Sequence, residues 1–184
     1  MKQMFALYFL FLSFGCSSIK NTPKIEKYTK LDSITVKSLM KEYSIDIPEN
    51  WDSYLEAHYH LSHSPEGLLI NRKTINASLF ILKKSIEKCK CNNIDELTTC
   101  FVKKKKKTYK NFNYDLVKGK HPLYGRYNFV IYKKIYFNKN YTTLNALILK
   151  DQNYYIITYN ALSEKYKIYA DDIVKIIHSF KIKE

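Results

Sequence analysis

The chain has 184 residues and a formal net charge of +14, with 31 lysines and arginines against 17 aspartates and glutamates. This length suits one domain with a full hydrophobic core and excludes a large multidomain enzyme. A charge of this size is typical of proteins that bind nucleic acid or anionic membranes. However, lysine, asparagine, isoleucine and tyrosine are all abundant, which is the bias of an AT-rich genome, so the charge alone predicts neither partner.

The first 16 residues resemble the signal peptide of a bacterial lipoprotein. Lys2 supplies a positive charge, residues 5–12 form an apolar run too short to span a bilayer, and Gly15 is a small residue before Cys16. In such proteins the signal is removed in front of the cysteine, which carries the acyl chains of the membrane anchor. We therefore expect residues 1–15 to be a signal peptide and Cys16 to be lipidated. The alternative is a secreted protein with a chance cysteine.

The residues after Cys16 predict the location of the mature protein. Ser17 and Ser18 lack the aspartate that retains many lipoproteins in the inner membrane, and no acidic run follows them. We therefore expect an anchor in the outer membrane of a bacterial cell envelope, facing the periplasm. Residues 16–40 are predicted to be a lipidated tether, and residues 41–184 the globular domain, because the stretch up to about Asp32 has only scattered apolar residues.

Alternation of apolar and polar residues predicts the strands of the first half of the domain. A helical turn is expected over 35–42. Strands are expected at 43–47, 54–61 and 75–81, with a turn at 64–67.

In the middle of the chain the pattern changes to helical spacing. Asn93 is a good N-cap, and Asp95 and Glu96 lie where the helix dipole favours negative charge. Ile94, Leu97 and Phe101 follow helical spacing, which predicts a helix over 93–109.

The second half predicts four strands and a closing helix. The strands are expected at 114–118, 126–137, 142–150 and 154–162. Residues 155–162 are apolar on both faces, which favours a central strand covered on two sides. Ser163 is expected to cap the final helix, whose apolar residues fall on one stripe: Tyr169, Ile173, Ile176, Ile177 and Phe180.

These elements predict an α+β fold, an antiparallel sheet of about six to seven strands flanked by helices. Residues 43–51 (YSIDIPENW), the Ser64-Pro65 pair and the ending 173–181 resemble the PsbP-like family, which includes DcrB-type bacterial lipoproteins. The resemblance implies an α/β/α sandwich and a binding or accessory module, because members of this fold bind unrelated partners and mostly lack catalysis.

Three cysteines remain once Cys16 is lipidated. Cys89, Cys91 and Cys100 would lie in a compartment that permits disulfides. A bond within Cys-x-Cys is strained, so Cys100 is expected to pair with Cys91 or with Cys89. Closing about ten residues in this way adds about 2 to 3 kcal/mol of stability. The alternative is three reduced cysteines without a role.

Three histidines form the pattern H-x-H-x-x-H. On a strand, His58 and His60 project from the same face, and with His63 they could ligate a zinc or copper ion. The alternative is a polar, solvated strand face. Because no fourth ligand is evident, we expect metal binding no tighter than that of scattered surface histidines.

A run of five lysines follows Phe101: Lys103, Lys104, Lys105, Lys106 and Lys107. Five consecutive helical residues cannot all face one way, so Lys104 or Lys105 must lie near the apolar stripe, with its stem covering apolar surface. The run is either a solvated helix end or a contact with anionic lipid headgroups.

The sequence carries no nucleophile elbow and no phosphate-binding glycine loop, so we expect no catalysis and no cofactor. The favoured function is a non-enzymatic binding or accessory lipoprotein of the cell envelope, with the membrane and either an envelope protein or a small ligand as partners, and no nucleic acid. The rivals are a metal-handling lipoprotein that uses the histidines and a hydrolase with a dispersed site.

Overall fold

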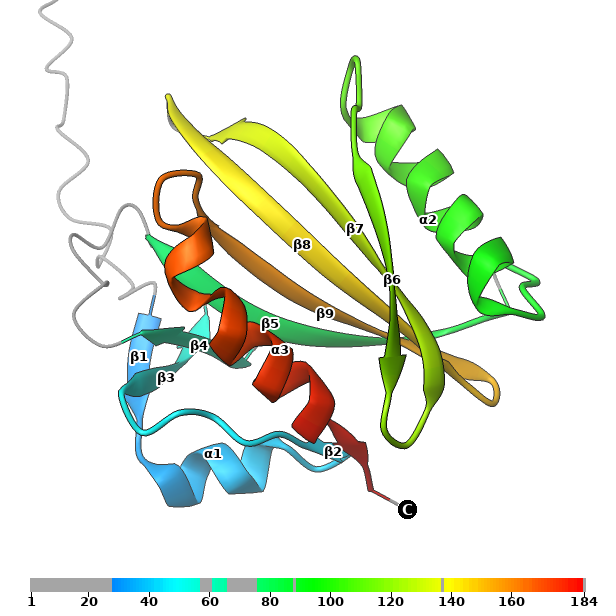
Figure 1. Cartoon of the computed structure of the whole chain (residues 1–184). Coiled ribbons are helices and arrows are strands. Elements are labelled where there is room, and N and C mark those ends of the chain that lie inside the picture. Colours follow the sequence, from blue (N-terminus) through cyan, green and yellow to red (C-terminus); the bar gives the residue numbers. More distant parts are fainter. Residues whose placement is uncertain (1–27, 57–60, 66–75, 88, 137, 184) are drawn as a thin grey trace, which may run out of the picture.

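The computed structural model describes residues 28–56, 61–65, 76–87, 89–136 and 138–183. An eight-stranded antiparallel sheet has helices on both faces, with α1 and α3 on one face and α2 on the other (Figure 1). The strand order is β1-β3-β4-β5-β9-β8-β7-β6, and β2 and β10 form a separate two-stranded sheet. The predicted α+β sandwich is confirmed, with one strand more in the main sheet than expected.

The elements follow one another along the chain with short connections. The first half contains β1 (Tyr28–Leu31), α1 (Ser33–Leu39), β2 (Tyr43–Ser44), β3 (Trp51–Glu56), β4 (Leu61–Pro65), β5 (Ala77–Ser85) and α2 (Ile94–Thr108). The second half contains β6 (Asp115–His121), β7 (Gly125–Tyr136), β8 (Lys139–Lys150), β9 (Asn153–Leu162), a 3-10 turn (Tyr166–Tyr169), α3 (Ala170–Ser179) and β10 (Lys181–Ile182).

Strand β9 is a central strand that contributes side chains to two separate cores. Successive residues of a strand point to opposite faces. Tyr155 and Ile157 therefore pack in the core under α3, whereas Tyr154 and Ile156 pack in the core under α2. All four are at most 5% exposed, which confirms that this strand is covered on both sides.

The apolar stripe of the last helix faces the sheet as predicted. Ile173, Ile176, Ile177 and Phe180 are at most 1% exposed, and they pack with residues of β5, β8 and β9. The start of this helix differs from the prediction. Ser163 does not cap it, because its hydroxyl accepts a hydrogen bond from Thr142 at 3.0 Å, and a 3-10 turn separates Ser163 from the first residue of α3.

The segment predicted as a tether overlaps with ordered elements of the fold. Strand β1 pairs with β3, and Asp32 caps α1 by accepting hydrogen bonds from Ile34 and Thr35. Val36 and Met40 then join the core under α3. Strand β1 was not predicted because few apolar residues precede Asp32. An edge strand and a short helix can each form with only one or two buried side chains.

The first predicted strands are also rearranged. The expected strand at 54–61 corresponds to two strands, β3 and β4, paired antiparallel with Trp51 opposite Pro65, while residues 57–60 lie outside the described residues. Ser64 and Pro65, expected in a turn, are the last residues of β4, and the Ser64 hydroxyl donates to the Ala77 carbonyl. Proline is tolerated there because it ends the strand.

The strand expected at 43–47 keeps only Tyr43 and Ser44, which pair with β10 outside the main sheet. Its next apolar residue, Ile45, is buried in the core under α3. The alternating pattern correctly indicated that Ile45 is buried. It did not indicate the partner of β2, because β10 lies at the other end of the chain.

Candidate functional site

A groove of about 660 Å³ lies between α2 and the sheet face that this helix covers only in part. Side chains of α2 form one wall, and β5, β7, β8 and β9 form the bed. Aromatic and aliphatic residues supply most of its apolar surface: Phe80, Leu82, Phe101, Tyr109, Tyr132, Tyr154 and Ile156. The remaining lining residues are charged or polar, so the groove combines apolar walls with many polar groups. Its volume is within the range of small-molecule sites.

Lysines give this groove a positive rim. Lys84 comes from β5, Lys104 and Lys105 from α2, and Lys134 from β7, and a single carboxylate, that of Glu87, is among the lining groups. In the described part of the chain none of these four lysines forms an ion pair with a carboxylate. The Lys105 ammonium instead lies 5.3 Å from the ring centre of Phe101 and 5.5 Å from that of Tyr132.

The like charges of the rim are close enough to affect one another. Lys134 is half-buried, and burial together with the nearby Lys105 charge lowers the pKa of its ammonium. An anion in the groove would offset the repulsion between Lys105 and Lys134, because it supplies an opposite charge.

A polar strip crosses the bed of the groove on β8 and β9. Thr143 lies opposite Asn160 and donates to its side-chain oxygen at 2.7 Å, and Thr158 lies opposite Asn145 and donates to its side-chain oxygen at 3.0 Å. The Nδ2 group of Asn145 is buried and interacts with the hydroxyl of Tyr132, which also lines the groove.

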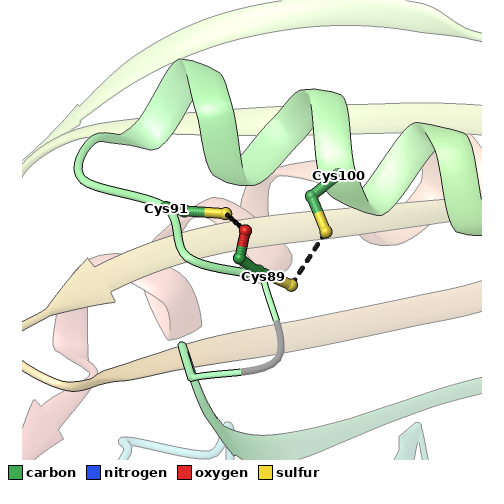
Figure 2. A group of neighbouring side chains, drawn as sticks. All are labelled: Cys89, Cys91 and Cys100. Carbon is green, nitrogen blue, oxygen red and sulfur yellow. Dashed lines mark hydrogen bonds between the residues drawn. The ribbon is translucent and has the colours of Figure 1, made fainter.

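Next to the groove, three cysteines lie together (Figure 2). The sulfurs of Cys89, Cys91 and Cys100 are all within 4.8 Å of one another. The Cys100 thiol donates to the Cys89 sulfur at 2.8 Å, and the Cys91 thiol lies 3.4 Å from the Cys89 carbonyl oxygen. The Lys104 ammonium, on the groove rim, donates to the Cys89 sulfur at 3.2 Å and so joins the two features.

These contacts shift the pKa values of the thiols in opposite directions. Burial opposes ionisation of Cys89, but hydrogen bonds from Cys100 and Lys104 outweigh it, and the pKa of Cys89 is lowered. Burial and the neighbouring Cys89 and Cys100 sulfurs raise the pKa of Cys91 to about 12. Cys89 is therefore the thiol that ionises first.

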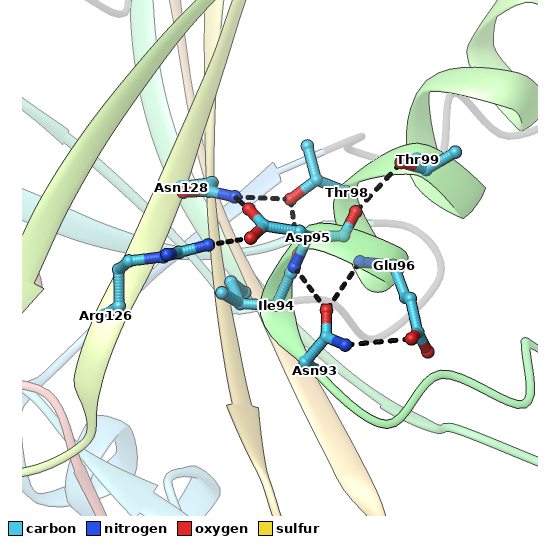
Figure 3. A network of polar contacts seen from close by, with 8 residues as sticks. All are labelled: Asn93, Ile94, Asp95, Glu96, Thr98, Thr99, Arg126 and Asn128. Carbon is cyan, nitrogen blue, oxygen red and sulfur yellow. Dashed lines mark hydrogen bonds and ion pairs between the residues drawn. The ribbon is translucent and has the colours of Figure 1, made fainter.

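The helix that carries Cys100 is fixed to the sheet at its N-terminus (Figure 3). The side-chain oxygen of Asn93 accepts from the backbone N–H groups of Asp95 and Glu96, which confirms the predicted N-cap. Asp95 accepts hydrogen bonds from Arg126 and from Asn128 on β7. The bonds from Arg126 and Asn128 lower the pKa of the Asp95 carboxyl.

The predicted histidine site is only partly described. His58 and His60 lie outside the described residues, so their role stays a prediction. His63 is 1% exposed in β4, where its Nδ1 lies 2.8 Å from the Ser53 hydroxyl. Burial lowers the pKa of His63 to about 4. His63 therefore lies in the interior of the fold, and the turn expected directly after it, at 64–67, is not found at Ser64 and Pro65, which belong to β4.

The other predicted site residues fall as follows. Cys16 lies outside the described residues. Both candidate partners of Cys100 are near it, Cys89 being the residue it contacts, and all three cysteines are free thiols in this structure. Of the five lysines at 103–107, Lys105 places its ammonium over the ring of Phe101. Contact of this run with anionic lipid headgroups stays a prediction.

The groove was not predicted from the sequence. Its one local signal is a pair of polar residues at alternate positions in two apolar strands: Thr143 and Asn145 in β8, and Thr158 and Asn160 in β9. Because β8 and β9 form a hairpin, these two pairs of residues lie next to each other on one face of the sheet. They form a polar strip on a face whose other residues are mostly apolar.

Comparison with protein-family models and with curated protein sequences finds no match. Among solved structures, a protein from Bacteroides thetaiotaomicron is similar with a TM-score of 0.49 and 10% identity over 77% of this chain, which spans 45% of that protein. LpqN of Mycobacterium tuberculosis, which is involved in cell envelope biogenesis, has a TM-score of 0.44 and 9% identity, covering 85% of this chain and 91% of LpqN.

The cyanobacterial PsbP of Synechocystis has a TM-score of 0.44 and 10% identity, covering 89% of this chain and 96% of that protein. At these identities and TM-scores the likeness does not extend to function. Within the described residues, no helix is long and apolar enough to cross a bilayer.

Proposed function

We propose that this chain is a lipid-anchored protein of the bacterial cell envelope that binds, without catalysis, a small anionic amphiphile in the groove between α2 and the sheet. The observation that carries the proposal is the combination of lysines lacking an ion-pair partner with apolar walls in one groove. A carboxylate or similar anionic group would lie between Lys105 and Lys134.

The chemistry of the lining supports a ligand with two unlike ends. The rings of Phe101, Tyr109 and Tyr132 offer apolar contact, and the polar strip of β8 and β9 lies in the same lining. The lining contains one carboxylate, Glu87, and neither histidine nor cysteine, so it lacks the paired acid and base that hydrolysis commonly uses.

Fluorescence titration with 11-(dansylamino)undecanoic acid, an anionic probe with an apolar body, tests the binding. We expect Lys134→Met and Lys105→Met each to weaken probe binding by about tenfold, because each removes a charge-assisted contact worth more than 1 kcal/mol. Lys107→Met is the matched control, since this exposed lysine lies on the same helix but does not line the groove; it should change the affinity less than twofold.

The uncharged methyl ester of the same probe separates charge recognition from apolar adsorption. It should bind more weakly than the acid and should not distinguish Lys134→Met from the unchanged protein. Equal binding of acid and ester, or no binding of the acid, would contradict the proposed ligand class.

The anchor is proposed from Cys16 and the apolar run before it, and its expected location is the outer membrane, facing the periplasm. Mass spectrometry of the protein purified from membranes should find an acylated N-terminal Cys16. Cys16→Ala should move the protein to the soluble fraction, whereas Ser17→Ala should leave it in the membrane. An unmodified N-terminus, or a membrane-bound Cys16→Ala protein, would refute the anchor and leave the groove proposal untouched.

A further inference from the structure

The three-cysteine cluster opens into a hollow of its own, separate from the groove. This hollow of about 480 Å³ is lined by the three cysteines together with polar residues of the loop and of the first turns of α2. We propose that Cys89, Cys91 and Cys100 form a three-sulfur site for a monovalent thiophilic metal ion, Cu(I). Soft thiolate ligands select such ions over hard cations.

The backbone holds two of the ligands in place before any metal binds. Lys90 has a φ of 49°, in the left-handed region, which turns the chain sharply between Cys89 and Cys91. The N–H groups of Cys89 and Lys90 both donate to the Ile86 carbonyl at 2.8 Å and fix this turn. The two sulfurs can therefore face the same side, although they are two residues apart.

The third ligand comes from a rigid helix. Cys100 lies about two turns beyond the capped N-terminus of α2, between the core residues Leu97 and Phe101 in the sequence. Sites built on packed elements lose little affinity to ordering when the ion binds. Because the three sulfurs are already within 4.8 Å of one another, binding an ion between them needs no rearrangement of the fold.

The surroundings favour an ion whose coordination shell needs only three sulfur ligands. The described residues offer no fourth histidine, cysteine or carboxylate in this group. The nearest carboxylates are already engaged, Asp95 by Arg126 and Asn128, and Glu96 by the backbone of Asn92 and the side chain of Asn93. Structural zinc sites use four ligands, so three sulfurs fit Cu(I) better.

The charge of the site also fits a monovalent ion. Three thiolates around Cu(I) leave a net charge of two negative units, and the Lys104 ammonium beside Cys89 offsets part of it. Binding is a ligand exchange without electron transfer: each thiol that ligates loses its proton to solvent, and copper remains Cu(I).

Anaerobic titration of the reduced full-length chain with Cu(I), in competition with the chromogenic chelator bicinchoninate, tests the proposal. All variants carry Cys16→Ala, so that only the three cluster thiols remain. We expect one Cu(I) per chain. Cys89→Ser and Cys100→Ser should each lower the affinity at least about 100-fold, because losing a ligand costs more than losing a group that only orients one, which itself costs about 10- to 100-fold. Thr99→Ala, which alters the same hollow without removing sulfur, is the control.

Cys89 and Cys100 are chosen because both are half-exposed, whereas Cys91 is 2% exposed and its substitution could disturb folding. Circular dichroism of each variant verifies the fold. X-ray absorption at the copper edge should show three sulfur neighbours. Fewer sulfurs, displacement of copper by equimolar Zn(II), or unchanged affinity in Cys89→Ser would overturn the proposal.

Two further outcomes would also overturn it. A Cys89–Cys100 disulfide in the protein isolated from cells, resistant to mild reductants, would show that the cluster serves as a covalent link. Loss of copper binding in His58→Ala or His60→Ala would assign the metal to the histidines. Neither outcome bears on the amphiphile groove, whose test uses lysine variants.

Discussion

At the scale of single residues, Gly119 on the edge strand β6 has a role that depends on its cross-strand neighbour. It lies opposite Tyr127, and a Cβ at this position would overlap the Tyr127 ring. Tyr127 is 4% exposed and packs against Phe129, so it has little freedom to move aside. We expect Gly119→Ala to lower the free energy of unfolding by about 1 to 3 kcal/mol.

Urea denaturation of Gly119→Ala, Tyr127→Ala and the double variant measures this effect. The double variant should lose less stability than the sum of the two single losses, because removing the ring also removes the overlap. Strict additivity would show that the overlap is not the cause.

His63 predicts how the stability of the fold depends on pH. Its pKa is about 4 in the folded protein, against 6.5 in the unfolded chain, so the unfolded state binds more protons between these values. Stability should therefore be full above pH 6.5 and should fall by about 3 kcal/mol as the pH drops to 4. Buried His121, whose pKa is lowered by burial, acts in the same direction.

The difference between wild type and His63→Asn isolates this contribution, because asparagine keeps a polar contact for Ser53 and does not titrate. Denaturation curves at several pH values should show a shallower loss of stability in His63→Asn. His178→Asn, at an exposed position of α3, controls for the loss of one histidine. Parallel curves for wild type and His63→Asn would contradict the assignment.

At the scale of elements, α3 holds the sheet face closed through its buried stripe. Ile176 is fully buried, whereas Val174, two residues earlier on the same helix, is 39% exposed. We expect Ile176→Ala to cost about 2 to 5 kcal/mol, from lost apolar burial and the cavity left behind. Val174→Ala should cost less than about 1 kcal/mol. Thermal and urea unfolding compare the two variants, and similar losses would show that the stripe does not face the core.

At the scale of the whole molecule, the two cores share one sheet and should unfold together. Leu97 belongs to the core under α2 and Ile176 to the core under α3, on opposite faces of the sheet. Because β9 contributes side chains to both, loss of either core should expose the other. We expect a single cooperative transition, with the stability losses of Leu97→Ala and Ile176→Ala adding to within about 0.5 kcal/mol.

Two optical signals test this cooperativity. Trp51, the single tryptophan, lies in the core under α3, so its fluorescence reports on that layer, while far-ultraviolet circular dichroism reports on the whole chain. The two unfolding curves should coincide. Separate midpoints would show that the layers unfold independently.

The sequence by itself determined the features that depend on local periodicity. The cap at Asn93, the stripe of α3 and the doubly buried β9 could all be predicted, because helical spacing, capping groups and apolar runs lie within a few residues of one another. The same locality explains the errors. Residues 57–60, between β3 and β4 in the sequence, contain no glycine and continue one alternating pattern across both strands. Strand β2 pairs with a strand at the opposite end of the chain.

Only the tertiary structure decided the candidate sites. The groove exists because α2 covers part of a sheet face. This leaves the polar strip of β8 and β9 beside four lysines from three elements. The thiol cluster exists because one turn of α2 lies over the loop that carries Cys89 and Cys91. Both depend on how elements pack against each other, and that packing is set by buried contacts between residues far apart in the chain, which spacing along the sequence does not encode.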